Sequence, residues 1–201
     1  MKPILETIDT RFGTASKHAF SRGNALPYTG VPFGMNYFVP QTSDQEGSWF
    51  FDPHQPIFQG IRLTHQPSPW IGDYSWLLLT PVTGEISGDT LFHRQSSYNL
   101  DRAIFNPHYL RIFSERYQME TQLIPTCYGA SIQLRQIQGK KLSLYLHAAD
   151  DLSLEQVDER TVSLGQSGLT ETNKSPLVMF TALAFSTDIC LLYTSDAADE
   201  E

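Results

Sequence analysis

The sequence predicts an all-β protein built as an antiparallel β-sandwich, and three observations lead to this prediction. Apolar and polar residues alternate with a period of two in several short stretches, as in strands with one buried face. Gly, Pro and Asn recur between these stretches as turn signals. Helical periodicity is weak throughout the chain. Many short strands separated by turns favour a sandwich over a helical or mixed fold.

The strands are clearest in the second half of the chain. The sequence is loop-rich before Tyr109, whereas residues 117–123 and 142–148 each alternate between apolar and polar side chains. Gly139 lies between two such runs and predicts a tight hairpin turn. The stretch from Leu177 to Phe185 is apolar almost throughout, which predicts a strand covered on both faces or a central sandwich strand.

Length and charge limit the classes of function. The chain has 201 residues, of which 40% are hydrophobic, so it can bury a core as one domain. Its net charge of −8 disfavours nucleic acid as a partner, because phosphate recognition needs clustered Lys and Arg. No apolar run approaches the ~20 residues of a membrane span, so we expect no membrane partner.

The N-terminus and the cysteines predict a cytoplasmic protein. Residues 1–6 contain no long apolar stretch and include Glu6, unlike a secretory signal peptide. Cys127 and Cys190 are too few for a disulfide framework. The histidines show no spacing typical of metal ligands, and no metal site is expected in this chain.

Two loop segments contain the candidate binding residues. The stretch from Gly60 to Tyr74 is stiffened by a Pro-Ser-Pro sequence and includes His65, Trp70 and Asp73. Phe33 and Gly34 lie in an earlier Pro- and Gly-containing segment. Rigid loops with aromatic and polar side chains commonly bind ligands, because little entropy is lost in positioning them. An indole beside imidazole and carboxylate groups suits a sugar, which offers both C–H faces and hydroxyls.

Each candidate also has a structural interpretation. Trp70 can stack on a sugar or anchor its loop to the sheet. His65 can bind a hydroxyl or satisfy a local hydrogen bond, and Asp73 can bind sugar hydroxyls or cap its own loop. Phe33 and Gly34 can line a ligand pocket or allow close approach of the backbone to another strand.

The chain resembles a known family in several ordered motifs. These motifs cover Ile8 to Thr14, Asn24 to Met35, Thr64 to Tyr74, and Leu78 to Gly84. Together they are similar to the N-terminal β-sandwich domain of glycoside hydrolase family 92, the calcium-dependent exo-acting α-mannosidases. Beyond about Pro107 the resemblance is only a pattern of strands.

The resemblance implies how the enzyme is divided between domains. Family members are expected to hydrolyse mannose from glycans with inversion, using one carboxyl as general acid and another as general base. Both carboxyls and the calcium ligands are implied to lie in a following (α/α)₆ barrel. This chain would complete the sugar pocket with Phe33, Gly34, His65, Trp70 and Asp73, and would contain no catalytic residue. We therefore expect the chain alone to be inactive.

The C-terminal segment looks foreign to the domain. Residues 188–201 resemble translated sequencing-adapter read-through, although a natural acidic tail is the alternative. We therefore expect a supersandwich-like domain over residues 1–187 that is truncated at its C-terminal end. Two other functions stay open: a stand-alone, non-catalytic carbohydrate-binding module, and a structural sandwich whose loops only contact another domain.

Overall fold

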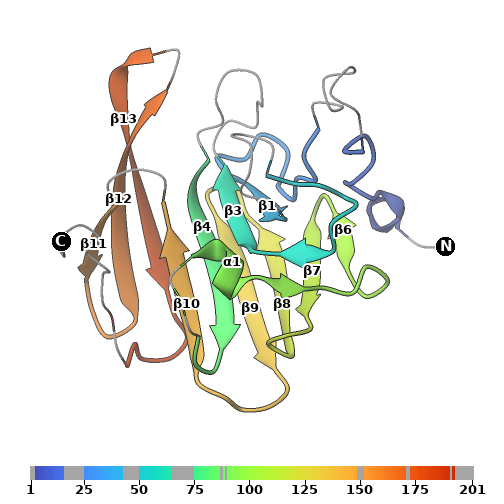
Figure 1. Cartoon of the computed structure of the whole chain (residues 1–201). Coiled ribbons are helices and arrows are strands. Elements are labelled where there is room, and N and C mark those ends of the chain that lie inside the picture. The colour runs from blue at the N-terminus through green and yellow to red at the C-terminus, as the bar shows by residue number, and fades with distance from the viewer. Residues whose placement is uncertain are drawn as a thin grey trace. The chain divides into compact units, whose positions relative to one another are not determined.

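Antiparallel strands form most of the regular structure in the computed structural model, which confirms the predicted all-β sandwich (Figure 1). The structure describes residues 3–15, 25–42, 50–64, 75–86, 88, 90–148, 152–170, 173–190 and 192. The chain forms two compact units, Met1–His147 and Ala148–Glu201. Among the residues described, no helix has the length and hydropathy of a transmembrane span.

The first sheet of the N-terminal unit joins strands from distant parts of the chain. Its strands are β1 (Tyr37–Gln41), β3 (Gly60–Thr64), β4 (Ser75–Thr83) and β10 (Leu142–His147). They pair in the order β1-β3-β4-β10, and all three pairings are antiparallel. The late strand β10 therefore completes a sheet that begins near the N-terminus.

The second sheet is a meander of consecutive strands. It contains β6 (Ile104–Asn106), β7 (Tyr109–Ser114), β8 (Met119–Pro125) and β9 (Ala130–Gln136), each paired with the next. Smaller elements complete the described part of this unit: η1 (Ile4–Thr7), α1 (Leu91–Arg94), and the pair of β2 (Ile57–Phe58) with β5 (Ser96–Ser97).

Strand β8 confirms the predicted alternation. Met119, Thr121 and Leu123 are buried, whereas Glu120 and Gln122 are only half-buried. Strand β10 is also found where it was predicted. Its central side chains, however, are half-buried on both faces, so its alternation of burial is weaker than the sequence pattern.

The predicted tight hairpin at Gly139 is wrong. Gly139 does adopt a positive φ of 61°, so the chain bends there. However, β9 pairs with β8 while β10 pairs with β4, so the two strands that flank Gly139 do not pair with each other. The loop instead crosses from the second sheet to the first (Figure 1).

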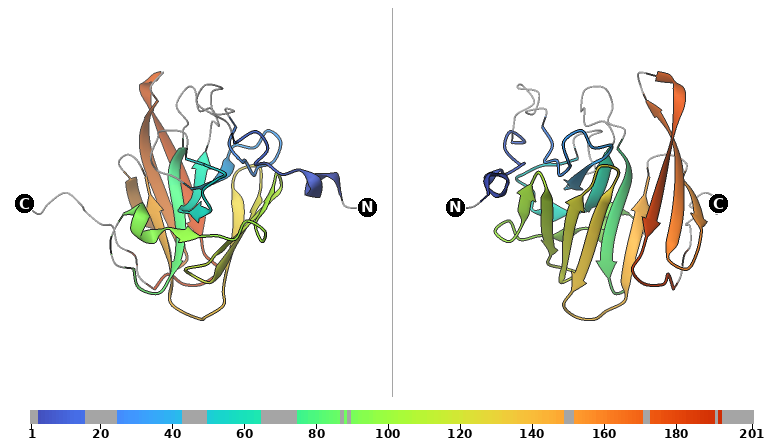
Figure 2. Two further views of the ribbon diagram at one scale, coloured as in Figure 1. Left: turned by 45° about the vertical axis from the view of Figure 1, so that its right-hand side comes forward. Right: turned by 180° about the vertical axis from the view of Figure 1, so that it is seen from behind.

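The two four-stranded sheets of the N-terminal unit lie against each other (Figure 2). A hydrophobic cluster joins residues of both sheets. Val82 on β4 is fully buried with Met119 on β8 and Tyr117 beside it. Leu134 of β9 and Tyr145 of β10 pack against this cluster. The Thr83 hydroxyl also donates a hydrogen bond of 2.9 Å to the carbonyl of Tyr117.

The C-terminal unit is a three-stranded antiparallel sheet within its described residues. Strands β11 (Leu152–Gln156), β12 (Thr161–Thr170) and β13 (Asn173–Ala184) pair in that order. Strand β13 confirms a strand over most of the apolar stretch. The prediction that it is covered on both faces or central is wrong, because β13 is the edge strand of this sheet within the described residues. Phe180 is 77% exposed on this edge strand. Its ring lies beside Gly165, where a Cβ would approach Phe180 Cε1 to 3.4 Å.

Candidate functional site

Two predicted binding loops are attached at the same end of the first sheet. The register of β1 with β3 places Tyr37 opposite Thr64, and that of β3 with β4 places Thr64 opposite Ser75. Phe33 and Gly34 shortly precede Tyr37 in the chain. Residues 65–74 connect Thr64 to Ser75. The backbone therefore anchors both loops at one end of the sheet.

Phe33 is held on a strained turn. The Gly34 N–H donates to the Val31 carbonyl at 3.0 Å and closes a β-turn with Pro32 at its second position. Phe33 occupies the third position with a φ of 59°, a region that non-glycine residues rarely adopt. Its side chain is 100% exposed. The turn thus directs a large ring into solvent at a conformational cost.

Gly34 is the last residue of this turn and lies close to its first residue. A Cβ at Gly34 would lie 3.0 Å from Val31 Cγ2 and 3.2 Å from the Val31 carbonyl oxygen. The backbone at Gly34 therefore approaches the start of its own turn closely. Neither this contact nor the exposure of Phe33 tests the predicted ligand contact of these residues, which stays a prediction.

The turn between β8 and β9 supports the Phe33 loop and adds a second exposed ring. The Met35 N–H donates to the Cys127 carbonyl at 2.7 Å, and Asn36 Nδ2 donates to the Tyr128 carbonyl at 2.9 Å. Tyr128 is 83% exposed and Met35 is 49% exposed. We name the exposed rings of Phe33 and Tyr128, together with the Met35 side chain, the aromatic platform.

Tyr128 was missed by the sequence analysis, although a signal for it exists. Tyr128 precedes Gly129 at the tip of a turn, where the Thr126 N–H donates to the Gly129 carbonyl at 2.7 Å. An aromatic residue in a short turn between two strongly alternating strands has no core to enter. Such a residue is therefore exposed by its position.

A partly buried chain of polar side chains joins β1 to β3 toward the end of the sheet opposite these loops. Arg62 Nε donates to Gln41 Oε1 at 2.7 Å, and Gln41 Nε2 donates to Gln59 Oε1 at 2.9 Å. Gln41 is fully buried, and the guanidinium of Arg62 lies 5.0 Å from the centroid of the Phe50 ring. Hydrogen bonds to a charged group have defined geometry, so this chain rigidifies the strands from which the loops extend.

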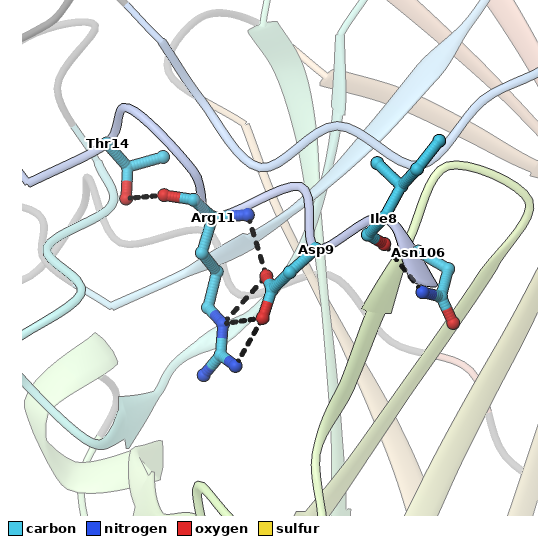
Figure 3. A network of polar contacts seen from close by, with 5 residues as sticks. All are labelled: Ile8, Asp9, Arg11, Thr14 and Asn106. Atoms are coloured by element: carbon cyan, nitrogen blue, oxygen red, sulfur yellow. Dashed lines mark hydrogen bonds and ion pairs between the residues drawn. The ribbon is translucent and has the colours of Figure 1, made fainter. Parts of the chain in front are cut away.

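The N-terminal segment is fastened to β6 (Figure 3). Asn106 Nδ2 donates to the Ile8 carbonyl at 2.7 Å, and the Thr10 N–H donates to the Phe105 carbonyl at 2.8 Å. Asp9 and Arg11 form a bidentate ion pair whose shortest contact, from Arg11 Nη2 to Asp9 Oδ2, is 2.7 Å. The hydrogen bond from Arg11 is the main reason that the pKa of Asp9 is lowered.

Three of the predicted binding residues lie outside the described residues. His65, Trp70 and Asp73 all fall within residues 65–74, which the structure does not describe. Their predicted roles stay predictions. Within the described ranges, no three His, Cys, Asp or Glu side chains gather closely enough to hold a metal ion. The resemblance places the calcium ligands in a following domain, so the calcium itself stays a prediction.

The sequence comparison shows the family. The Glycosyl hydrolase family 92 N-terminal domain matches residues 7–189 of this chain, which is most of its length. The chain therefore belongs to glycoside hydrolase family 92 as an N-terminal domain, and the resemblance found in the motifs is confirmed. Comparison with curated proteins found no match.

Solved structures share the fold. An inverting family GH92 mannosidase from Bacteroides thetaiotaomicron matches with a TM-score of 0.77 and 24% identity, over 94% of this chain. A family GH92 alpha-mannosidase from the same organism matches with a TM-score of 0.71 and 16% identity, over 83% of this chain. A third GH92 glycosyl hydrolase matches with a TM-score of 0.60 and 14% identity, over 78%. The matched regions span only 28%, 24% and 23% of those three chains.

Proposed function

We propose that this chain is the N-terminal, pocket-completing part of an exo-acting α-mannosidase that removes mannose from glycans. The match to the family 92 N-terminal domain over residues 7–189 carries this proposal. The mannosidase names of the structural neighbours support it, as does the fully exposed Phe33.

The aromatic platform suits the sugar side of this proposal. A pyranose presents a C–H face that packs on an aromatic ring, and hydroxyl groups at its edges that bind polar partners. Phe33 and Tyr128 offer two exposed rings whose loops are joined by the hydrogen bonds to the Cys127 and Tyr128 carbonyls. The strain at Phe33 supports a binding role, because such conformations cluster at functional sites.

The chemistry itself is proposed to belong to a following domain. In this proposal the (α/α)₆ barrel of the intact enzyme supplies the general acid, the general base and the calcium ion, and hydrolysis proceeds with inversion. The two carboxyls and their calcium-binding partners would then be absent from residues 1–187. The chain alone is accordingly expected to bind mannose weakly and to hydrolyse nothing.

A direct test combines an activity assay with a binding assay on the chain. We expect no mannose release from aryl α-mannosides, with or without added calcium, and calcium-dependent turnover would overturn the division between domains. We expect Phe33→Ala to weaken mannose binding at least severalfold. Phe92→Ala, which removes a 70% exposed ring from α1, is the matched control and should leave binding unchanged.

The alternative is a stand-alone carbohydrate-binding module. The exposed platform favours it to the extent that both rings belong to this chain and need no second domain. Affinity separates the two functions, since a module that works alone must bind a glycan without the barrel. Micromolar binding by the isolated chain would support the module, whereas millimolar binding supports an incomplete enzyme pocket.

A further inference from the structure

A groove of about 540 Å³ lies beside the N-terminal segment, apart from the aromatic platform. One side is formed by residues 6–9 and the other by residues 103–106 with His108 and Tyr109. The two sides are tied together by the hydrogen bond from Asn106 to the Ile8 carbonyl. We name this feature the N-terminal groove. Its volume lies within the range of pockets that hold small-molecule ligands.

The charges of this groove favour an uncharged ligand. Among the described residues that line it there is no Lys or Arg, which disfavours an anion. Asp9 lines it, but its two carboxylate oxygens accept four hydrogen bonds from Arg11, so its charge and its acceptor sites are already used. Glu6 is then the one remaining carboxylate among the lining residues.

Three lining side chains have hydrogen-bonding capacity that is not used within the described residues. They are the carboxylate of Glu6, the imidazole of His108 and the hydroxyl of Tyr109. Glu6 and His108 are exposed, whereas Tyr109 is half-buried. The Tyr109 hydroxyl is protonated at neutral pH and can donate, and burial raises its pKa further. Ile8 is 43% exposed and adds an apolar wall. Acceptors, donors and an apolar wall together match a sugar.

A backbone hydrogen bond joins the segment beside the groove to the segment that precedes the Phe33 turn. The Gly30 N–H donates to the Pro107 carbonyl at 2.8 Å, and the next residue, His108, lines the groove. Gly30 directly precedes the turn that presents Phe33. This hydrogen bond therefore holds the backbone beside the groove against the segment that leads to Phe33.

We infer that the N-terminal groove binds the inner sugars of a mannose-bearing glycan, as an uncharged-carbohydrate subsite that contains Glu6, His108 and Tyr109. The inference rests on the proposed function, because an exo-acting enzyme must hold the remaining glycan outside the pocket of the terminal sugar. The groove then contributes to glycan length preference, and the platform contributes to recognition of the terminal mannose.

The test compares mannose with an α-linked mannotriose by titration of the full 201-residue chain. We expect the trisaccharide to bind about tenfold more tightly than mannose, as two ordinary hydrogen bonds would give. The double variant His108→Ala/Tyr109→Phe should bring this ratio close to one and leave mannose affinity unchanged. The control His54→Ala/Tyr145→Phe, which changes an exposed His and a half-buried Tyr outside the groove lining, should keep the ratio. A ratio that is unchanged in the groove variant would overturn the inference.

A negative result for the proposed function differs from a negative result for the groove. If Phe33→Ala leaves mannose binding intact while the groove variant lowers the ratio, the platform is wrong and the groove stands. A second readout is the imidazole NMR signal of His108, which should shift with mannotriose and not with mannose. An unmodified chain that binds neither sugar, with no shift at His108, would reject the groove as a carbohydrate site.

Discussion

Replacing Phe33 by glycine separates stability from binding at the platform. Phe33 has a φ of 59°, and a non-glycine residue in this left-handed region costs about 1–2 kcal/mol relative to glycine. Glycine has no Cβ and relieves this cost, although its greater freedom in the unfolded chain costs about 0.5–1 kcal/mol. The ring is 100% exposed, so its removal forfeits no burial. We therefore expect Phe33→Gly to raise the free energy of unfolding by about 0.5–1 kcal/mol.

Urea denaturation measures this difference directly, with Phe33→Ala as the control. Alanine removes the ring but keeps the strained φ, so its stability should stay within about 0.5 kcal/mol of the unmodified chain. Thermal unfolding should show a Tm about 1–4 °C higher for the glycine variant. Both variants should bind mannose at least severalfold more weakly than the unmodified chain.

The opposite result would refute the reasoning about strain. A glycine variant less stable than the unmodified chain by more than about 1 kcal/mol would mean that the Phe33 ring packs in solution. Retained mannose affinity in both variants would instead mean that the strained turn has no role in recognition.

Two further predictions concern the core and the N-terminal segment. Met119→Ala should lower the free energy of unfolding by about 2–5 kcal/mol, because Met119 is fully buried between the sheets. Ile124→Ala on the same strand should cost less than about 1 kcal/mol, since Ile124 is 56% exposed; equal urea midpoints for the two would contradict the assigned faces of β8. Asp9→Asn should cost less than about 1 kcal/mol at pH 7, because the Asp9–Arg11 pair is partly exposed. The folded-state pKa of Asp9 is lowered, so its contribution is present above the unfolded pKa of about 3.9 and is lost as pH falls through the folded value. The gap between Asp9→Asn and the unmodified chain should therefore begin to narrow near pH ~4 and close only below the folded pKa of Asp9. A gap that keeps its full size as pH falls through this window would contradict the ion pair.

The positions of the strands could be predicted from the sequence better than the pairing between strands. The alternation around Met119 to Leu123 reflects one buried face, and a local pattern is enough to reveal it. Gly139 marks a bend, but the partner of β10 is chosen by packing against β4, far away in the chain. Phe180 belongs to an apolar run, yet its ring lies on the exposed face beside Gly165, because a glycine leaves space there.

The candidate site was predicted only in part for a similar reason. Phe33 and Gly34 stand out because Pro and Gly mark their turn. Tyr128 belongs to the platform through hydrogen bonds from Met35 and Asn36, which lie more than ninety residues earlier and have no local signal. Likewise, the N-terminal groove depends on η1 docking against β6, which only the tertiary structure reveals.

The crossing of the chain between β9 and β10 has a consequence for the order of folding. Strands β6 to β9 pair with their immediate neighbours, so each pairing closes only a short loop. The pairing of β4 with β10 joins Thr83 to Leu142 and must wait until the intervening meander has been synthesised. During translation the meander can therefore form first and present Met119 and Leu134 as a surface on which β4 and β10 meet. Until β10 arrives, one edge of β4 lacks a partner, and the nascent chain is open to mispairing at that strand.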